Sequence, residues 1–334
     1  MKKIIVLLLC IMMTVSAFAS CESRKAENSD TKLSVICTIF PIYDWVKNII
    51  GERAADIDIE MLVDNGVDLH NFQPTADDII NVSKCDMFIY VGGESDGWVD
   101  DVITTAKNES MIVVNLLEVL GDSVKAEEVK EGMEEEEHDH EEDDEHEEEE
   151  EHEEEEEFDE HVWLSLRNAK TICEYLAGQL STMDPDGSDT YSSNLADYSA
   201  KLEALDGEYK SAVESAEKNT LVFADRFPFR YMVDDYGLDY YAAFVGCSTD
   251  SEASFETVVF LANKLDELEL DHVIVIEGTD HKIADSVISS SQNKDRDILV
   301  LDSMQGITKA GSENEFSYIS IMESNLEVLR SALN

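Results

Sequence analysis

Positive charge is scarce in this chain. Its 334 residues include 24 Lys and Arg against 76 Asp and Glu, which gives a formal net charge of −52 at pH 7. A nucleic-acid-binding face of any size is excluded, because such faces are built from clustered basic residues. After the first 20 residues, the chain also lacks an apolar stretch of the roughly 20 residues that a transmembrane helix needs.

Paired cysteines are absent as well. Four cysteines follow the N-terminal segment, and they are widely spaced, lie in apolar contexts and form no CxxC motif: Cys37, Cys85, Cys173 and Cys247. We expect each to be a small buried side chain rather than half of a disulfide or a zinc ligand.

Motifs of hydrolytic enzymes are also missing. The chain has no HExxH, no GxSxG and no HxH pair outside one acidic stretch. A secreted metallohydrolase would need a metal with an open coordination position beside a general acid or base. The sequence therefore predicts a protein that is not an enzyme.

The N-terminus has the order of a secretory leader. Two lysines precede an apolar run over residues 4–15, and small residues continue to Ser20, which predicts a signal peptide over residues 1–20. Two interpretations of the processing site are possible. Ala17-Phe18-Ala19 fits ordinary signal-peptidase cleavage, whereas Phe18-Ala19-Ser20-Cys21 resembles a bacterial lipobox in which Phe18 replaces the usual Leu. We favour lipidation of Cys21, with residues 21–31 as a polar tether. The protein would then lie on the outer face of the cytoplasmic membrane, and the alternative is a free periplasmic or secreted chain.

One segment, residues 134–157, consists of 20 acidic residues and four histidines: His138, His140, His146 and His152. It lacks apolar residues and repels itself, so we expect a disordered loop. An acidic linker alone needs no histidine, and imidazole binds zinc and related metals. We therefore expect weak metal contacts there, the alternative being a solvated linker. Without these 20 acids the net charge is still −32, which weakly favours a protein that handles cations.

Apolar strands alternate with helices in both halves of the remaining chain, which predicts parallel sheets covered on both faces. The expected strands are 33–36, 57–62, 87–91 and 111–115, then 221–224, 239–244, 273–276 and 298–301. The expected helices are 43–50, 75–82 and 98–106, then 229–236, 255–268, 283–290 and 317–333.

Between the halves, residues 190–218 carry apolar residues three and four positions apart, which predicts one long helix of about 40 Å. We thus expect two α/β lobes, each with a small, mostly parallel sheet flanked by helices, joined by one rigid helix. The predicted boundaries are 32–183, 184–218 and 219–334. A coiled-coil dimerisation arm is disfavoured because the helix lies between globular halves, so a monomer is expected.

Two histidines stand at predicted loop-to-helix junctions. His70 lies in GVDLHNFQP, residues 66–74, between a strand and a helix, and His161 lies in DEHVWLS, residues 159–165, just past the acidic segment. Loops that follow strands are where α/β lobes present ligand-binding groups. His272, which begins a strand, is interpreted as structural.

These two motifs resemble those of the zinc and manganese solute-binding proteins that serve ABC transporters. The similarity also covers Tyr90-Val91-Gly92-Gly93, the linking helix and the acidic His-rich loop before the second motif, and so extends over essentially the whole mature chain. The resemblance implies one metal between two α/β lobes, with His70 and His161 as the ligands of the first lobe. It also implies an ABC permease and its ATPase as partners.

The resemblance implies two further ligands from the second lobe. Asp302, after the last strand, matches the acidic position of the family. The other position falls on Arg226, which stays protonated and cannot bind a metal. Two alternatives remain open, namely Asp225 after a one-residue shift and His281 from the loop after its own strand.

Two imidazoles with one or two further ligands at about 2.0–2.2 Å suit tetrahedral zinc. Two carboxylates beside them would also suit manganese, and the His-rich loop favours zinc. The predicted function is extracytoplasmic capture of zinc for uptake, with a manganese-specific protein of the same type, a surface adhesin or a passive metal buffer as alternatives.

Overall fold

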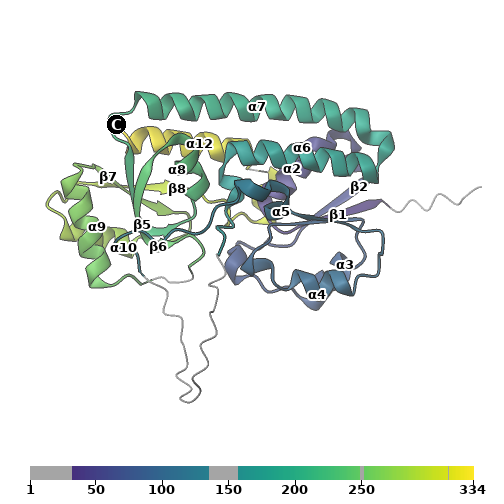
Figure 1. Cartoon of the computed structure of the whole chain (residues 1–334), viewed down its shortest axis with the longest axis horizontal. Coiled ribbons are helices and arrows are strands. Elements are labelled where there is room, and N and C mark those ends of the chain that lie inside the picture. Colours follow the sequence, from purple (N-terminus) through teal and green to yellow (C-terminus); the bar gives the residue numbers. More distant parts are fainter. Residues whose placement is uncertain (1–31, 135–156, 249–251, 315) are drawn as a thin grey trace, which may run out of the picture. The chain divides into compact units, whose positions relative to one another are not determined.

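The computed structural model describes residues 32–134, 157–248, 252–314 and 316–334 (Figure 1). The predicted signal peptide, Cys21 and the four histidines of the acidic segment lie outside these ranges. Residues 33–334 form a single compact unit. No helix within the described ranges is both long enough and apolar enough to cross a membrane.

The first half of this unit is built on a parallel sheet of four strands in the order β2-β1-β3-β4. Its strands are β1 (Leu33–Cys37), β2 (Ile57–Met61), β3 (Met87–Tyr90) and β4 (Ile112–Asn115). Its helices are α2 (Phe40–Ile50), α3 (Ala76–Val82), α4 (Val99–Thr104) and α5 (Leu116–Leu120). All four residues of β3 are buried, as expected of an inner parallel strand covered on both faces.

The second half repeats this plan with a parallel sheet in the order β6-β5-β7-β8. Its strands are β5 (Thr220–Phe227), β6 (Asp239–Val245), β7 (His272–Ile276) and β8 (Asp297–Leu301). Its helices are α8 (Arg230–Tyr236), α9 (Phe255–Glu267), α10 (Lys282–Ser290) and α11 (Lys309–Asn314). The predicted fold of two α/β lobes is therefore confirmed.

The long linking helix is also confirmed, as α7 (Ser188–Ser215, 28 residues). It packs against α2 and α6 (Leu166–Met183) of the first lobe and against α12 (Tyr318–Ala332). Figure 1 shows α7 running past both sheets. The predicted apolar stripe forms the buried face of this helix. Burial of one side chain on this face, such as Leu202, stabilises the folded state by about 2 kcal/mol.

The last helix, α12, contacts both lobes. It contacts β8 and α7, but also α2 of the first lobe. The hydroxyl of Tyr318 donates to the carbonyl of Trp163 at 2.7 Å, and the indole of Trp163 donates to the carbonyl of Ser303 at 2.9 Å. These buried hydrogen bonds connect the two lobes directly.

Candidate metal centre

His70 is positioned by short-range hydrogen bonds in the turn after β2. Asp68 begins a single 3₁₀ turn, Leu69–Asn71, and its carboxylate accepts the backbone N–H of His70 at 3.0 Å. The Nδ1 atom of His70 lies 2.7 Å from the hydroxyl of Ser95, which follows β3. With Nδ1 held in this way, Nε2 is the ring nitrogen left for a ligand.

His161 is fully buried, immediately before the 3₁₀ turn Val162–Leu164. One oxygen of the Asp159 carboxylate accepts the backbone N–H of His161 at 2.8 Å and lies 3.0 Å from its Nδ1. A carboxylate at Nδ1 fixes the tautomer of a histidine and makes its Nε2 a better metal ligand.

The two Nε2 atoms converge on one point, 3.1 Å apart, although 91 residues separate the histidines in the chain. A tetrahedral zinc ion with Zn–N bonds of about 2.0–2.1 Å holds its nitrogen ligands about 3.3 Å apart. The observed spacing therefore fits two ligands of one tetrahedral ion.

The electrostatics of the two rings differ. Burial, followed by the charge of His161, lowers the pKa of His70 to about 3. Burial also disfavours the charged form of His161, but the charge and hydrogen bond of Asp159 outweigh it, and the pKa of His161 is raised. The two pKa values therefore shift in opposite directions, and a divalent cation bound between the rings would displace a proton held by either ring.

A third candidate donor lies in the second lobe. Among the described residues, one group of at least three His, Cys, Asp or Glu side chains can hold a metal, and its ligand atoms lie within 4.8 Å of one another: His70, His161 and Cys247. Cys247 follows β6 and is half-buried, whereas the other three cysteines are buried as predicted.

Two buried polar groups beside the pair have atoms without a hydrogen-bond partner among the described residues: Glu160 Oε2 and Gln305 Oε1. Glu160 Oε2 lies 3.6 Å from Nδ1 of His70, and the amide nitrogen of Gln305 lies 3.5 Å from Nε2 of His161. Turning the Gln305 amide over would point its oxygen toward His161. Unsatisfied buried oxygens are costly, and a cation at Nε2 of His161 would satisfy the turned Gln305 oxygen, whereas Glu160 lies outside the group of converging ligand atoms.

His70 borders a cavity of about 310 Å³, which is lined by His70, Glu94, Ser95, Glu127, Glu157, Phe158, Glu160 and Cys247. We call this cavity the acidic vestibule, because four of the lining residues are glutamates. A concave site lined by one sign of charge concentrates ions of the opposite sign. The vestibule thus offers cations a path to the histidines.

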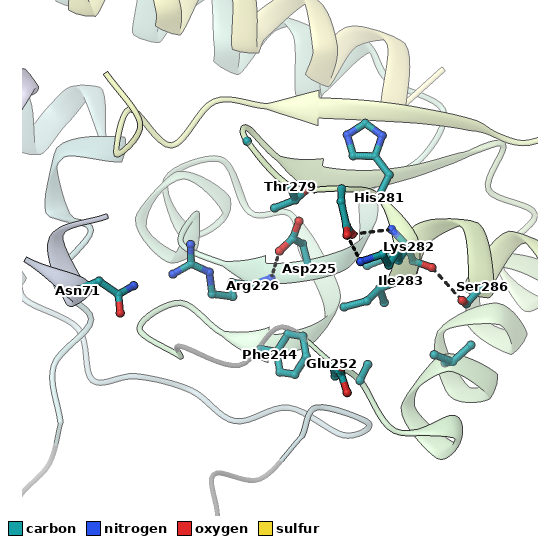
Figure 2. A pocket seen from close by; sticks show the side chains of 15 residues that line it. Asn71, Asp225, Arg226, Phe244, Glu252, Thr279, His281, Lys282, Ile283 and Ser286 are labelled. Atoms are coloured by element: carbon teal, nitrogen blue, oxygen red, sulfur yellow. Dashed lines mark hydrogen bonds and ion pairs between the residues drawn. The ribbon is translucent and has the colours of Figure 1, made fainter. Parts of the chain in front are cut away.

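Asp225 and His281 lie elsewhere, in a pocket of about 680 Å³ whose lining includes neither His70 nor His161 (Figure 2). The Asp225 carboxylate accepts the backbone N–H of Arg226 at 2.9 Å and that of Ile276 at 3.2 Å. His281 is half-buried at the start of α10, with a left-handed φ of 58°. Neither residue belongs to the group that contains the histidine pair.

Asp302 follows β8, as expected, but it too lies outside that group. Its carboxylate accepts the backbone N–H of Met304 at 2.7 Å. The side-chain amide of Asn325 on α12 accepts the backbone N–H of Asp302 and donates to the backbone carbonyl of Asp302. Burial, and then the charge of Asp302, raise the pKa of nearby Glu277 to about 7. Because Asp302, Asp225 and His281 all lie outside the group that contains the histidine pair, their role as metal ligands stays a prediction.

The sequence interpretation missed Cys247 and Gln305. Neither residue belongs to a motif with recognisable ligand spacing. The available signal is the position of Gly246-Cys247 directly after a buried strand, because the carboxyl ends of parallel strands are where ligand-binding groups gather.

A comparison with protein families confirms the family resemblance. A family model described as zinc-uptake complex component A, periplasmic (ZnuA), matches residues 35–332. The chain belongs to the ZnuA family.

Members of this family from two organisms are similar over nearly the whole chain. The high-affinity zinc uptake system protein ZnuA of Bacillus subtilis is 29% identical over 324 residues, which are 97% of this chain and 95% of that protein. The zinc-binding lipoprotein AdcA of Streptococcus pneumoniae serotype 4 is 30% identical over 332 residues. That alignment covers 99% of this chain but only 61% of AdcA.

Solved structures share the two-lobed fold. The metal-dependent lipoprotein YcdH of Bacillus subtilis superimposes with a TM-score of 0.70 at 26% identity, covering 90% of this chain and 99% of that one. The Zn(II)-bound ZnuA-like domain of Streptococcus pneumoniae AdcA gives a TM-score of 0.69 at 24% identity, covering 91% and 99%. At that identity the second likeness concerns the fold alone.

Proposed function

We propose that this chain is the extracytoplasmic, zinc-binding component of an ABC uptake transporter. The ion is captured between the lobes by Nε2 of His70 and Nε2 of His161 and is then delivered to a permease. The observation that carries the proposal is the 3.1 Å separation of these two buried nitrogens, each with its Nδ1 held by a hydrogen-bonding partner.

Zinc is favoured over manganese as the cargo. Imidazole nitrogens suit zinc, whereas manganese prefers oxygen donors, and the carboxylates of Asp302 and Asp225 lie outside the group of converging ligand atoms. Relatives over nearly the whole chain are named for zinc uptake or zinc binding. These names support the proposal, because the chain shares their family.

The acidic His-rich segment adds a weaker, accessory contact. Its first residue, Glu134, donates its backbone N–H to the carbonyl of Ala243 on β6, and the carbonyl of Glu157 at its far end accepts from Glu127. Glu157 also lines the acidic vestibule. We propose that His138, His140, His146 and His152 gather zinc near this cavity.

Delivery depends on the partner. Because α7 and α12 bridge the lobes, spontaneous opening is small, and the permease must separate or distort the lobes to release the ion. We propose that Cys21 carries a lipid that holds the monomeric protein at the outer face of the membrane, beside the permease and its ATPase.

Chelator-competition titration tests the proposal. The exported chain should bind one zinc tightly, and His70→Ala or His161→Ala should each weaken binding by at least about 100-fold, because each removes a ligand. His272→Ala, at the start of β7, serves as the control and should bind normally. A version lacking residues 135–156 should keep the tight site.

The opposite pattern would refute the proposal. If removing residues 135–156 abolished tight binding while both histidine variants kept it, the loop would be the binding element. If manganese bound more tightly than zinc at the histidine pair, the protein would be a manganese carrier of the same type.

A further inference from the structure

We propose that Cys247 is the third metal ligand and that its thiolate makes the site selective for zinc over manganese. This inference rests on the proposed capture of a metal by the histidine pair. It replaces an expected oxygen ligand of the second lobe with sulfur, and it assigns metal selectivity to one residue.

Cys247 reaches the site because of the glycine before it. A Cβ atom at Gly246 would lie 3.0 Å from Cε1 of His161 and 2.9 Å from the carbonyl oxygen of Phe227. Any larger residue would push the segment after β6 away from the imidazole. Glycine therefore lets this segment pack against the ring, and the next side chain has its sulfur within 4.8 Å of one ring nitrogen of each histidine.

Hydrogen bonds hold the segment in place. The backbone N–H of Cys247 donates to the Glu127 carboxylate at 3.1 Å. The guanidinium of Arg226 donates to the carbonyl of Ser248 at 3.2 Å and to the carboxylate of Asp68 at 2.7 Å. Arg226 thus connects the residue after Cys247 to the residue that caps the His70 turn.

The surroundings of Cys247 differ from those of the other cysteines. Cys37, Cys85 and Cys173 are at most 1% exposed and belong to the apolar core. Cys247 instead lines the acidic vestibule together with His70. A cysteine that only fills space has no need of a polar cavity or of two imidazoles beside it.

A thiolate changes which metals the site prefers. Zinc binds mixed nitrogen and sulfur ligands, with Zn–S bonds of about 2.3 Å, whereas manganese prefers carboxylate, carbonyl and water oxygens. Two imidazoles with one thiolate therefore discriminate against manganese more strongly than two imidazoles with carboxylates.

Cobalt(II) is a spectroscopic probe for this ligand, because a cobalt–thiolate bond gives an intense charge-transfer band in the near ultraviolet. The exported chain with one equivalent of cobalt should show this band, and Cys247→Ala and Cys247→Ser should lack it. Cys173→Ala keeps Cys247 and should retain the band, as should Asp302→Asn, which alters the expected oxygen ligand. Melting temperatures of the metal-stripped variants check that each is folded.

Affinities provide the second measurement. Cys247→Ser should weaken zinc binding by at least about tenfold and change manganese binding by less than about threefold. Independently of any variant, zinc should protect Cys247 of the wild-type chain from alkylation by iodoacetamide.

The outcomes separate this inference from the proposed function. A cobalt band that persists in both Cys247 variants, or zinc and manganese affinities that fall equally, would overturn the ligand role of Cys247. If His70→Ala still abolished zinc binding in that case, the proposed function would stand. Loss of the band in the Cys247 variants together with selective loss of zinc affinity would support the inference.

Discussion

At the scale of single residues, Asp159 is the group that orients His161, one of the two proposed metal ligands. Its carboxylate bonds both the backbone N–H and Nδ1 of His161. Asp159→Asn should weaken zinc binding about 10- to 100-fold, because an amide holds the imidazole tautomer less firmly than a carboxylate. Chelator competition measures the loss.

The control for this prediction is Asp235→Asn, which changes a carboxylate hydrogen-bonded to Ser165, away from the histidine pair. It should bind zinc as the wild type does. If Asp159→Asn lowered the melting temperature of the metal-stripped protein but left zinc affinity intact, Asp159 would be a structural residue only.

The residues of the site were predictable to different degrees. His70 and His161 stand in local motifs at loop-to-helix junctions, and the structure brings them together. For Cys247 the sequence predicts only a small buried side chain, because its neighbours in sequence are apolar and no second cysteine gives a ligand spacing. Its proximity to His161 depends on packing between the lobes, which local sequence does not encode.

At the scale of elements, the junction of three helices contains a buried acid, Asp44 of α2. Its carboxylate accepts the hydroxyl of Tyr198 on α7 and the backbone N–H of Tyr318 on α12. Burial, only partly offset by these hydrogen bonds and by Lys47, raises the pKa of Asp44 from 3.8 to about 6.

The raised pKa predicts a defined pH dependence of stability. As pH rises from about 4 to about 6, the unfolded chain releases this proton first, so the folded state loses stability on the order of 3 kcal/mol from this group. Asp44→Asn cannot titrate. The free energy of unfolding of Asp44→Asn minus that of the wild type should therefore rise as pH increases from about 4 to about 6, and should stay constant above pH 6.

Urea unfolding of both proteins at several pH values measures this difference, and the many other acids cancel in the comparison. Asp184→Asn, which removes the partner of Arg53, is a control for a buried acid that is already paired with a cation. A difference between Asp44→Asn and the wild type that stays constant with pH would contradict the prediction.

The elements themselves were largely predictable. Strands of the parallel sheets appear as short β-branched runs, and α7 appears as a long apolar stripe, because burial on a regular element leaves a regular pattern. The helix α6 was not among the expected elements, although its burial follows a helical period. β5 extends three residues beyond the predicted Ala224, and its pairing with β6 shifts register between Phe223 and Arg226.

The register shift in β5 lies at the strand where the family resemblance places a ligand of the second lobe. Asp225 lies within the irregular part of the pairing, and its carboxylate bonds the backbone of β7. Such an irregularity re-aims neighbouring side chains, and the one-residue shift considered for Asp225 does not predict its direction.

At the scale of the whole molecule, Arg226 connects the two lobes across the metal centre. It stands on β5 of the second lobe, and its guanidinium bonds both Asp68 of the first lobe and the carbonyl of Ser248. The position that the family resemblance assigns to a ligand is thus occupied by a group that holds the lobes together.

Arg226→Lys should speed zinc release about tenfold, because lysine keeps the positive charge but lacks the planar fork that reaches both acceptors. Keeping the charge matters, since removing a cation near the site would by itself slow the departure of zinc and mask the effect. Stopped-flow mixing of the zinc-loaded protein with excess chelator measures the release rate.

The matched control is Arg330→Lys, an exposed arginine of α12 whose carboxylate partners are Glu208 and Glu327. Exposed ion pairs of this kind stabilise the folded protein by only about 0–1 kcal/mol, so the Arg330→Lys variant should release zinc at the wild-type rate. If Arg226→Lys also released zinc at the wild-type rate, the contact with Asp68 would not limit opening. The packing of α7 and α12 across both lobes would then be the barrier that the permease has to overcome.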